Sequence, residues 1–377
     1  MRSFDGFLDS VALGLMSLFG PWSEHTEPVT WSVDGLIDLV RVRAISGSIV
    51  VRGGSQDVVM VRATKTVRGP TKELADPTGW SRFARRVEVQ MTHVGNSVHL
   101  QTLFPRPPLG CAVFVRYEIT LPWAVDADLY TESGGITVSG IEGAVEAETR
   151  SGNIDLVDTS GPATVRTASG RIHASGVEGA IQAENDQGSI AVAACSDHIR
   201  LRTTSGDIGI DGCDGTIRAR SYQGNIRLDR GRGGAELETD GGDILAHFER
   251  LGAPGVFLTR TGRVDVTVAD LQAYLEAESL DGSVRVGLPT ACSAMLDAGT
   301  NDGTVLCDLP VDATQRSQSL LVGGLGEGYG PLIKVRSFSG DIHVQQQDPA
   351  PAEGGVADGG TGDDDAAHGS SSSKAEH

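Results

Sequence analysis

Glycine returns along this chain on a fixed period, and this feature restricts the fold more than any other. The glycines that lie 18 residues apart are Gly134, Gly152, Gly170, Gly188, Gly206, Gly224 and Gly242. The series continues at Gly262, Gly282 and Gly303, with steps of 20, 20 and 21 residues, and a final copy, SFSGDIHV, contains Gly340. An aliphatic residue stands two positions after each glycine: Ile136, Ile154, Ile172, Ile190, Ile208, Ile226, Ile244, Val264, Val284, Val305 and Ile342. Six equal intervals identify a structural repeat.

Each unit carries two apolar segments that alternate with period two, such as Ile136/Val138 and Val145/Ala147. This alternation predicts two short strands and two turns per unit. One unit cannot bury its apolar face, whereas copies stacked about 4.8 Å apart close a core between two parallel sheets. The glycine suits a sharp turn that needs positive φ. We therefore predict an all-β fold, a parallel, β-helix-like β-solenoid with coils of about 18 residues, over residues 131–347.

Two polar columns support this register. The outward column of the second strand holds charged residues, and four of its five neighbouring pairs are opposite in sign: Glu148, Arg166, Glu184, Arg202, Arg220 and Glu238. Stacking would place these groups side by side. A column of small polar residues predicts a hydrogen-bonding ladder at the second turn of each unit: Thr149, Thr167, Asn185, Thr203, Ser221 and Thr239.

The flanks are expected to differ from the repeats. Residues 30–130 form an N-terminal β region with a first coil around Gly47 and a short helix within residues 71–86. Residues 1–21 form an amphipathic helix that Pro21 ends. This helix covers the first coil or, in the alternative, residues 4–19 make a peripheral membrane or partner contact. Residues 348–377 form a disordered acidic tail.

Composition narrows the class of partner and the compartment. A formal net charge of -19 repels nucleic acid over most of the surface, so a protein, a glycan or a cation is the expected partner. The five cysteines contain no CxxC pair, which favours a reducing compartment. The sequence contains no recognisable signal peptide or membrane-spanning helix. The cytoplasm is the expected location, with the cell envelope as the alternative.

The sequence contains no pattern that predicts catalysis, a cofactor or a metal site. The best acidic candidate is the turn column Asp207, Asn225 and Asp243, for which local hydrogen bonding is the favoured role and calcium the alternative. The GGxGxD motif of calcium-binding nonapeptide rolls does not occur in the turns. The nine histidines form no pair in one column. We therefore expect a protein that is not an enzyme.

Positive charge is concentrated at one place. Arg200, Arg202, Arg218 and Arg220 form a square on two adjacent layers, which predicts either a solvated charge ladder or an anion and partner patch. In another column, Cys195 and Cys213 lie 18 residues apart, close enough for a bridge, and stacked free thiols are the favoured state.

Three stretches resemble the bacterial putative-adhesin family of β-strand-repeat proteins. They are AISGSIVV at residues 44–51, VRYEITLPWAVDADLYTESGGITV at residues 115–138, and the SG-x-I units to about residue 308. The resemblance covers residues 30–345 and implies a β-helix-like fold with a role in adhesion or as a scaffold at the cell envelope. It implies no catalytic residue.

These observations lead to one expectation with two alternatives. The expectation is a non-catalytic, adhesin-like scaffold that presents sheet faces to a protein or glycan partner. The alternatives are a carbohydrate-active β-helix enzyme and an intracellular scaffold that associates with itself.

Overall fold

The computed structural model describes residues 22–70, 86–103 and 111–347, which all fall within one compact unit, Met1–Gln347. These residues form a β-sheet structure of 29 strands. The helix predicted for residues 1–21, nearly all of the one predicted within 71–86, and the tail at 348–377 lie outside the described residues. The strands are β1 (Trp22–Asp34), β2 (Leu39–Ser46), β3 (Ile49–Gly54), β4 (Val58–Pro70), β5 (Glu88–Val94), β6 (Ser97–Leu103), β7 (Ala112–Pro122), β8 (Asp126–Ser133), β9 (Ile136–Ser139), β10 (Val145–Ser151), β11 (Ile154–Thr159), β12 (Ala163–Ser169), β13 (Ile172–Val177), β14 (Ile181–Gln187), β15 (Ile190–Ala193), β16 (His198–Ser205), β17 (Ile208–Asp211), β18 (Asp214–Gln223), β19 (Ile226–Gly241), β20 (Ile244–Thr261), β21 (Val264–Val268), β22 (Leu275–Asp281), β23 (Val284–Leu288), β24 (Ala294–Thr300), β25 (Val305–Cys307), β26 (Val311–Arg316), β27 (Leu320–Leu325), β28 (Leu332–Ser337) and β29 (Ile342–Gln346).

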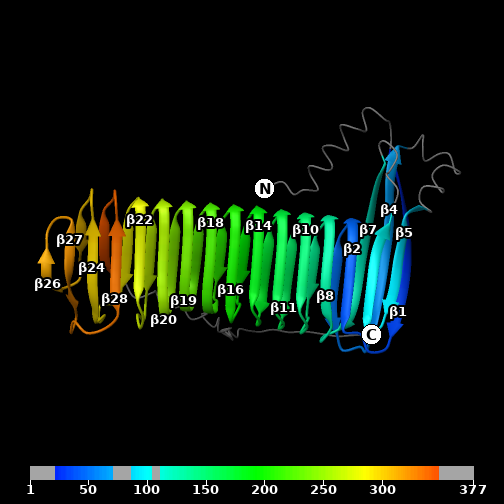
Figure 1. The fold of residues 1–377 in the computed structure, drawn as a ribbon, viewed down its shortest axis with the longest axis horizontal. Coiled ribbons are helices and arrows are strands. Elements are labelled where there is room, and N and C mark those ends of the chain that lie inside the picture. The colour runs from blue at the N-terminus through cyan, green and yellow to red at the C-terminus, as the bar shows by residue number, and fades with distance from the viewer. Residues whose placement is uncertain (1–21, 71–85, 104–110, 348–377) are drawn as a thin grey trace, which may run out of the picture. The chain divides into compact units, whose positions relative to one another are not determined.

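The repeats stack as a parallel β-solenoid, as predicted. Each rung consists of a strand on face 1, the glycine turn and a strand on face 2. Face 1 contains β8, β10, β12, β14, β16 and β18, and face 2 contains β9, β11, β13, β15 and β17 (Figure 1). Ile154 pairs with Ile172, which in turn pairs with Ile190, so equivalent residues meet 18 positions apart. The coil length inferred from the glycine spacing is therefore confirmed.

The core lies between the two faces and consists of the alternating apolar residues. The isoleucines that follow the turn glycines, such as Ile154 and Ile172, have no exposed surface. Where the glycine step lengthens from 18 to 20 residues, the longer rung encloses two aromatic rings. Phe248 and Phe257 meet edge to face there, with ring centroids 5.8 Å apart. Larger side chains thus fill the core of the larger rung, and the stack continues without a break.

The column of small polar residues forms a hydrogen-bonded ladder, although not at the turn where it was predicted. These residues precede the glycine turn, and each donates to the carbonyl oxygen of the turn glycine in the neighbouring rung. Thr149 donates to Gly134 at 3.0 Å and Thr239 donates to Gly224 at 2.9 Å. The side chains are buried. The second turn was the wrong location because the hydroxyl reaches an inward-facing carbonyl oxygen that the sheet hydrogen bonds leave without a partner.

The turn glycine is required by close contact between backbones as well as by its dihedral angles. Gly170 has a φ of +147°, and a Cβ atom at this position would lie 2.0 Å from the carbonyl oxygen of Gly152 in the neighbouring rung. No side chain fits at that distance. The glycine period thus records one steric requirement that every rung repeats.

At both ends of the solenoid, the order of the rungs in space differs from their order in the sequence. The rung of β2 and β3 lies between the rung of β6 and β7 and the rung of β8 and β9. Likewise, the rung of β28 and β29 lies between the rung of β22 and β23 and the rung of β24 and β25, as Figure 1 shows for β28. The place of the Gly340 copy in the sequence had suggested that it forms the final layer. In the structure it lies one layer inside the end of the stack.

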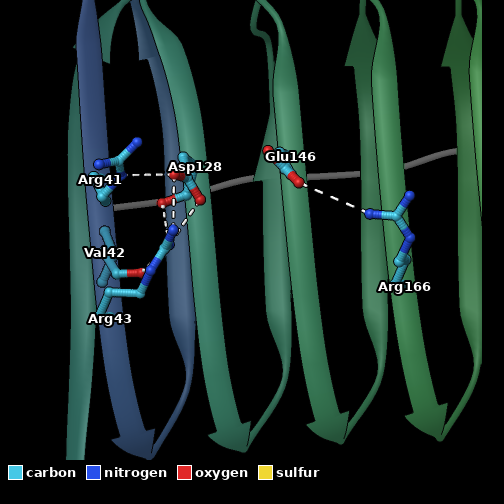
Figure 2. A network of polar contacts seen from close by, with 6 residues as sticks. All are labelled: Arg41, Val42, Arg43, Asp128, Glu146 and Arg166. Atoms are coloured by element: carbon cyan, nitrogen blue, oxygen red, sulfur yellow. Dashed lines mark hydrogen bonds and ion pairs between the residues drawn. The ribbon is translucent and has the colours of Figure 1, made fainter.

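Ion pairs fasten both inserted rungs to their neighbours. On β2, Arg41 and Arg43 converge on Asp128 of β8, each at 2.7 Å (Figure 2). On β28, Lys334 contacts Glu276 of β22 at 2.6 Å, and Arg336 contacts Asp297 of β24 at 2.5 Å. Because each pair joins two rungs that are distant in sequence, these contacts help to define the register of the inserted rungs.

The charge of Asp128 makes the N-terminal insertion sensitive to acid. Burial acts to raise the pKa of Asp128, but the hydrogen bonds and positive charges of Arg43 and Arg41 prevail and hold it below its ordinary value of 3.8. A pKa that is lower in the folded state stabilises the fold fully above pH 3.8, and this contribution is lost as the pH falls toward the folded value.

We expect Asp128→Asn to lower the free energy of unfolding by about 1 kcal/mol at neutral pH, because the arginines are partly exposed. The difference in melting temperature between Asp128→Asn and wild type should shrink as the pH is lowered through 3.8. Thermal unfolding over a pH series measures this, with Asp126→Asn as the control for a neighbouring carboxylate that contacts a backbone amide. A difference that stays constant with pH would contradict the role given to the charge.

Candidate functional site

The four arginines singled out in the sequence do lie together on face 1. Arg200 pairs with Arg218, and Arg202 pairs with Arg220, across β16 and β18. All four side chains are exposed. The next rung partly neutralises them, since Arg218 contacts Glu236 at 3.1 Å and Arg220 contacts Glu238 at 3.2 Å. This geometry is a charge ladder across a flat face, in which Arg200 keeps no ion-pair partner among the described residues.

The Asn and Asp residues after the turn glycines form a second ladder. Asp207 accepts a hydrogen bond from the backbone N–H of Asn225, Asn225 accepts one from Asp243, and Asp243 accepts one from Arg263, each at 2.8 Å. Asn153 accepts the N–H of Arg171 in the same way at 2.9 Å. These side chains therefore accept hydrogen bonds from the backbone N–H groups of the turns in neighbouring rungs. Among the described residues, no group of three or more metal-binding side chains was found.

The two stacked cysteines are free thiols in the core wall. Cys195 and Cys213 are both buried, and the thiol of Cys195 donates to the carbonyl oxygen of Ala193. The hydrogen bond between the two thiols raises the pKa of Cys195 and lowers that of Cys213, while burial acts to raise both. Both side chains are buried and belong to the hydrophobic core.

A groove of about 910 Å³ lies beside the glycine turns at the N-terminal end of the solenoid. Its wall comes from the antiparallel strands β1, β4 and β7, which pair in the order β1–β4–β7. Its floor consists of turn residues from successive rungs. The residues that line the groove include Glu24, Arg62, Arg68, Phe114, Arg116, Glu118, Ser48, Gly135, Asn153 and Asp155.

The wall carries charged groups, and some of them are already paired. Arg68 contacts Glu24 at 2.9 Å, and its guanidinium lies 5.8 Å from the ring centroid of Phe114. Asp155, at the floor, contacts Arg171 at 3.6 Å. Arg62, Arg116 and Glu118 have no ion pair within the part of the chain that the structure describes. The groove thus offers two free cations, one free carboxylate and an aromatic ring.

The groove was not among the features predicted from the sequence. The outward residues of RVRATKTVR and VFVRYE do show the period of two that marks one face of a strand, and this signal was available. However, nothing in the sequence indicated that β4, which is 13 residues long, would pair with both β1 and β7. Nor did it indicate that these strands would form a wall beside the turns of later rungs.

Within the described ranges, no helical segment has the length and apolar character that crossing a membrane requires.

This chain is similar to several proteins of known structure. Among the solved structures similar to this chain is a putative cell adhesion protein from Clostridium sporogenes, with 9% identity and a TM-score of 0.23, over 86% of this chain and 100% of that one. A putative adhesin from Parabacteroides distasonis has 9% identity and a TM-score of 0.28, over 86% and 97%. A putative lipid binding protein from the same organism has 11% identity and a TM-score of 0.31, over 85% and 97%. A search of the curated proteins gives no match. Residues 257–345 match the family model Toastrack DUF4097, a domain of unknown function, which confirms the resemblance to the bacterial putative-adhesin family that the sequence had suggested.

Proposed function

We propose that this chain is a non-catalytic binding module, an adhesin-like β-solenoid scaffold that presents its surface to a protein or glycan partner. The observation that carries the proposal is the groove of about 910 Å³, whose floor is the backbone of successive rungs and whose wall holds unpaired charged groups. The buried ladder, in which Thr131 donates to Gly47 and Thr149 donates to Gly134, holds the floor of the groove at fixed positions, and such preorganisation favours binding.

The carboxylates of the groove favour binding over catalysis. A glycoside hydrolase of the usual kind needs two carboxyl groups on either side of the scissile bond, one of them kept protonated. Of the three carboxylates at the groove, Glu24 pairs with Arg68 and Asp155 pairs with Arg171. Glu118 alone is left without an ion pair in the described part of the chain. The carbohydrate-active enzyme is therefore the weaker alternative.

The edge strands disfavour self-association as the main function. On face 1, the outermost strands are β5 and β26, and β26 is almost fully exposed and carries Asp312 and Arg316. On face 2, β25 is only three residues long, and β1, 13 residues long, carries Glu24, Glu27 and Pro28. Charged or very short edges hinder the addition of further strands. A cytoplasmic location, with the cell envelope as the alternative, remains part of the proposal, and fractionation of cells with an antibody tests it.

Incubation of the full chain with a panel of neutral and acidic polysaccharides, and with a cell-surface protein extract, tests the proposal. We expect at least one polysaccharide or protein to be retained by the immobilised chain, with no new reducing ends in the polysaccharides after prolonged incubation. New reducing ends would show catalysis and contradict the proposal. Failure to retain any member of the panel or the extract would also count against it.

A further inference from the structure

The ladder of Asn and Asp side chains is interrupted inside the groove. Strand pairing aligns Tyr117, Ile49 and Ile136, so the turn column reads Arg116, Ser48, Gly135, Asn153 from one rung to the next. Where the column holds Asn or Asp, that side chain accepts the N–H of the following rung, as Asp207 does for Asn225 at 2.8 Å. Arg171 and Ser189 interrupt the same column outside the groove. Ser48 makes no such bond, and Gly135 has no side chain to make it.

Two backbone donors are left open as a result. The N–H groups of Gly135 and Asn153 have no acceptor among the described residues, and both residues line the groove. By the geometry of the ladder, these donors point along the column toward Ser48, on whose far side Arg116 lies. Rungs are about 4.8 Å apart, so two amides and a guanidinium fall within about 15 Å of one another.

This combination suits a carboxylate. A backbone N–H without a partner can donate to a carboxylate oxygen, and an arginine adds a charge-assisted hydrogen bond to such an oxygen. Glu118, in the same groove, accepts hydrogen bonds from hydroxyl groups but repels a densely charged anion. A ligand that carries one carboxylate per sugar together with several hydroxyl groups satisfies both requirements. The ring of Phe114, intermediate in exposure, offers an apolar surface for a sugar ring.

We propose that the groove binds an acidic polysaccharide built from uronic acids, with a carboxylate at Arg116 and further oxygen atoms of the polymer at the N–H groups of Gly135 and Asn153. This inference rests on the proposed binding function and names the class of partner. The repeat of a polysaccharide suits a floor that itself repeats from rung to rung.

Gly135→Asn is the most direct test because it should extend the ladder across the gap. A Cβ atom at Gly135 meets no atom closer than 3.4 Å, so asparagine fits there. Its side-chain oxygen would accept the N–H of Asn153, as the equivalent groups do in other rungs. Ser189→Asn is the matched control, since Ser189 occupies the same column outside the groove. An asparagine there would accept the N–H of Asp207 instead. Neither variant should lower the melting temperature.

Titration of the full chain with polygalacturonate, and with dextran as a neutral polymer, gives the readout. We expect polygalacturonate to bind, with an affinity that falls as salt is raised, and dextran to bind at least about tenfold more weakly. Gly135→Asn and Arg116→Gln should each weaken binding by about tenfold or more. Ser189→Asn and Arg200→Gln, the latter on the arginine square, should change it by less than about twofold.

The outcomes separate this inference from the proposed function. Equal loss in Arg200→Gln and Arg116→Gln, or no effect of Gly135→Asn, would place the anion elsewhere and overturn the inference. No binding of polygalacturonate, while another glycan or a protein binds, would overturn the inference and leave the proposed function standing. Only failure of the whole panel and the protein extract would overturn both.

Discussion

Gly206→Ala should lower the free energy of unfolding by about 3 to 5 kcal/mol, because the turn admits no Cβ atom. Gly206 has a φ of +150°, and a Cβ atom there would lie 2.1 Å from the carbonyl oxygen of Gly188. That oxygen also accepts the hydroxyl of Thr203 at 3.3 Å. Moving it away therefore weakens the buried ladder, and the clash cannot be relieved by a change of side-chain rotamer alone.

Gly209→Ala in the same rung is the matched control. Nothing lies within 4 Å of a Cβ atom at Gly209, which stands at an outward position of β17. Because glycine weakens a strand relative to alanine, this variant should stabilise the fold by about 0.5 to 1 kcal/mol. Urea unfolding followed by circular dichroism compares the two. Similar midpoints for the two variants would show that the turn tolerates a side chain.

Ile333→Asp should unfold the C-terminal rungs selectively. Ile333 is fully buried in β28 and pairs with Leu275 on one side and Leu296 on the other. A carboxylate at this position costs about 4 kcal/mol or more, from the lost apolar side chain and the desolvated charge. Since the rung of β28 and β29 links the last repeats to the stack, residues 294–325 should lose protection together with residues 332–346.

Hydrogen exchange measured peptide by peptide tests this expectation. In a repeat protein, stability depends on contacts between neighbouring rungs, so residues 145–245 should keep their protection. Leu332→Asp is the control, because Leu332 is 42% exposed and its replacement leaves the core intact. Protection of residues 294–300 that survives in Ile333→Asp would show that the rung of β24 and β25 does not depend on the inserted rung.

The charge ladder of face 1 and the groove differ in how far a single sequence predicts them. The charge ladder on face 1, with Arg166 and Glu184 at 3.1 Å, followed directly from the 18-residue spacing. The groove did not, because its wall and floor come from strands that only tertiary pairing brings together. Arg116 and Gly135 lie two rungs apart with Ser48 between them, because the first coil is inserted between the rungs that contain them.

The sequence by itself determined the parallel stack, its 18-residue coil, its inward residues and the need for a turn glycine. These properties are local and repeat in every unit, so each rung states the same steric and apolar requirements. Only the tertiary structure decided the order of the rungs at the two ends, the pairing of β4 with β1 and β7, and the groove that results. Any coil of the right length presents the same edge to its neighbour, and specific contacts such as those of Asp128 with Arg41 and Arg43 select one arrangement from several.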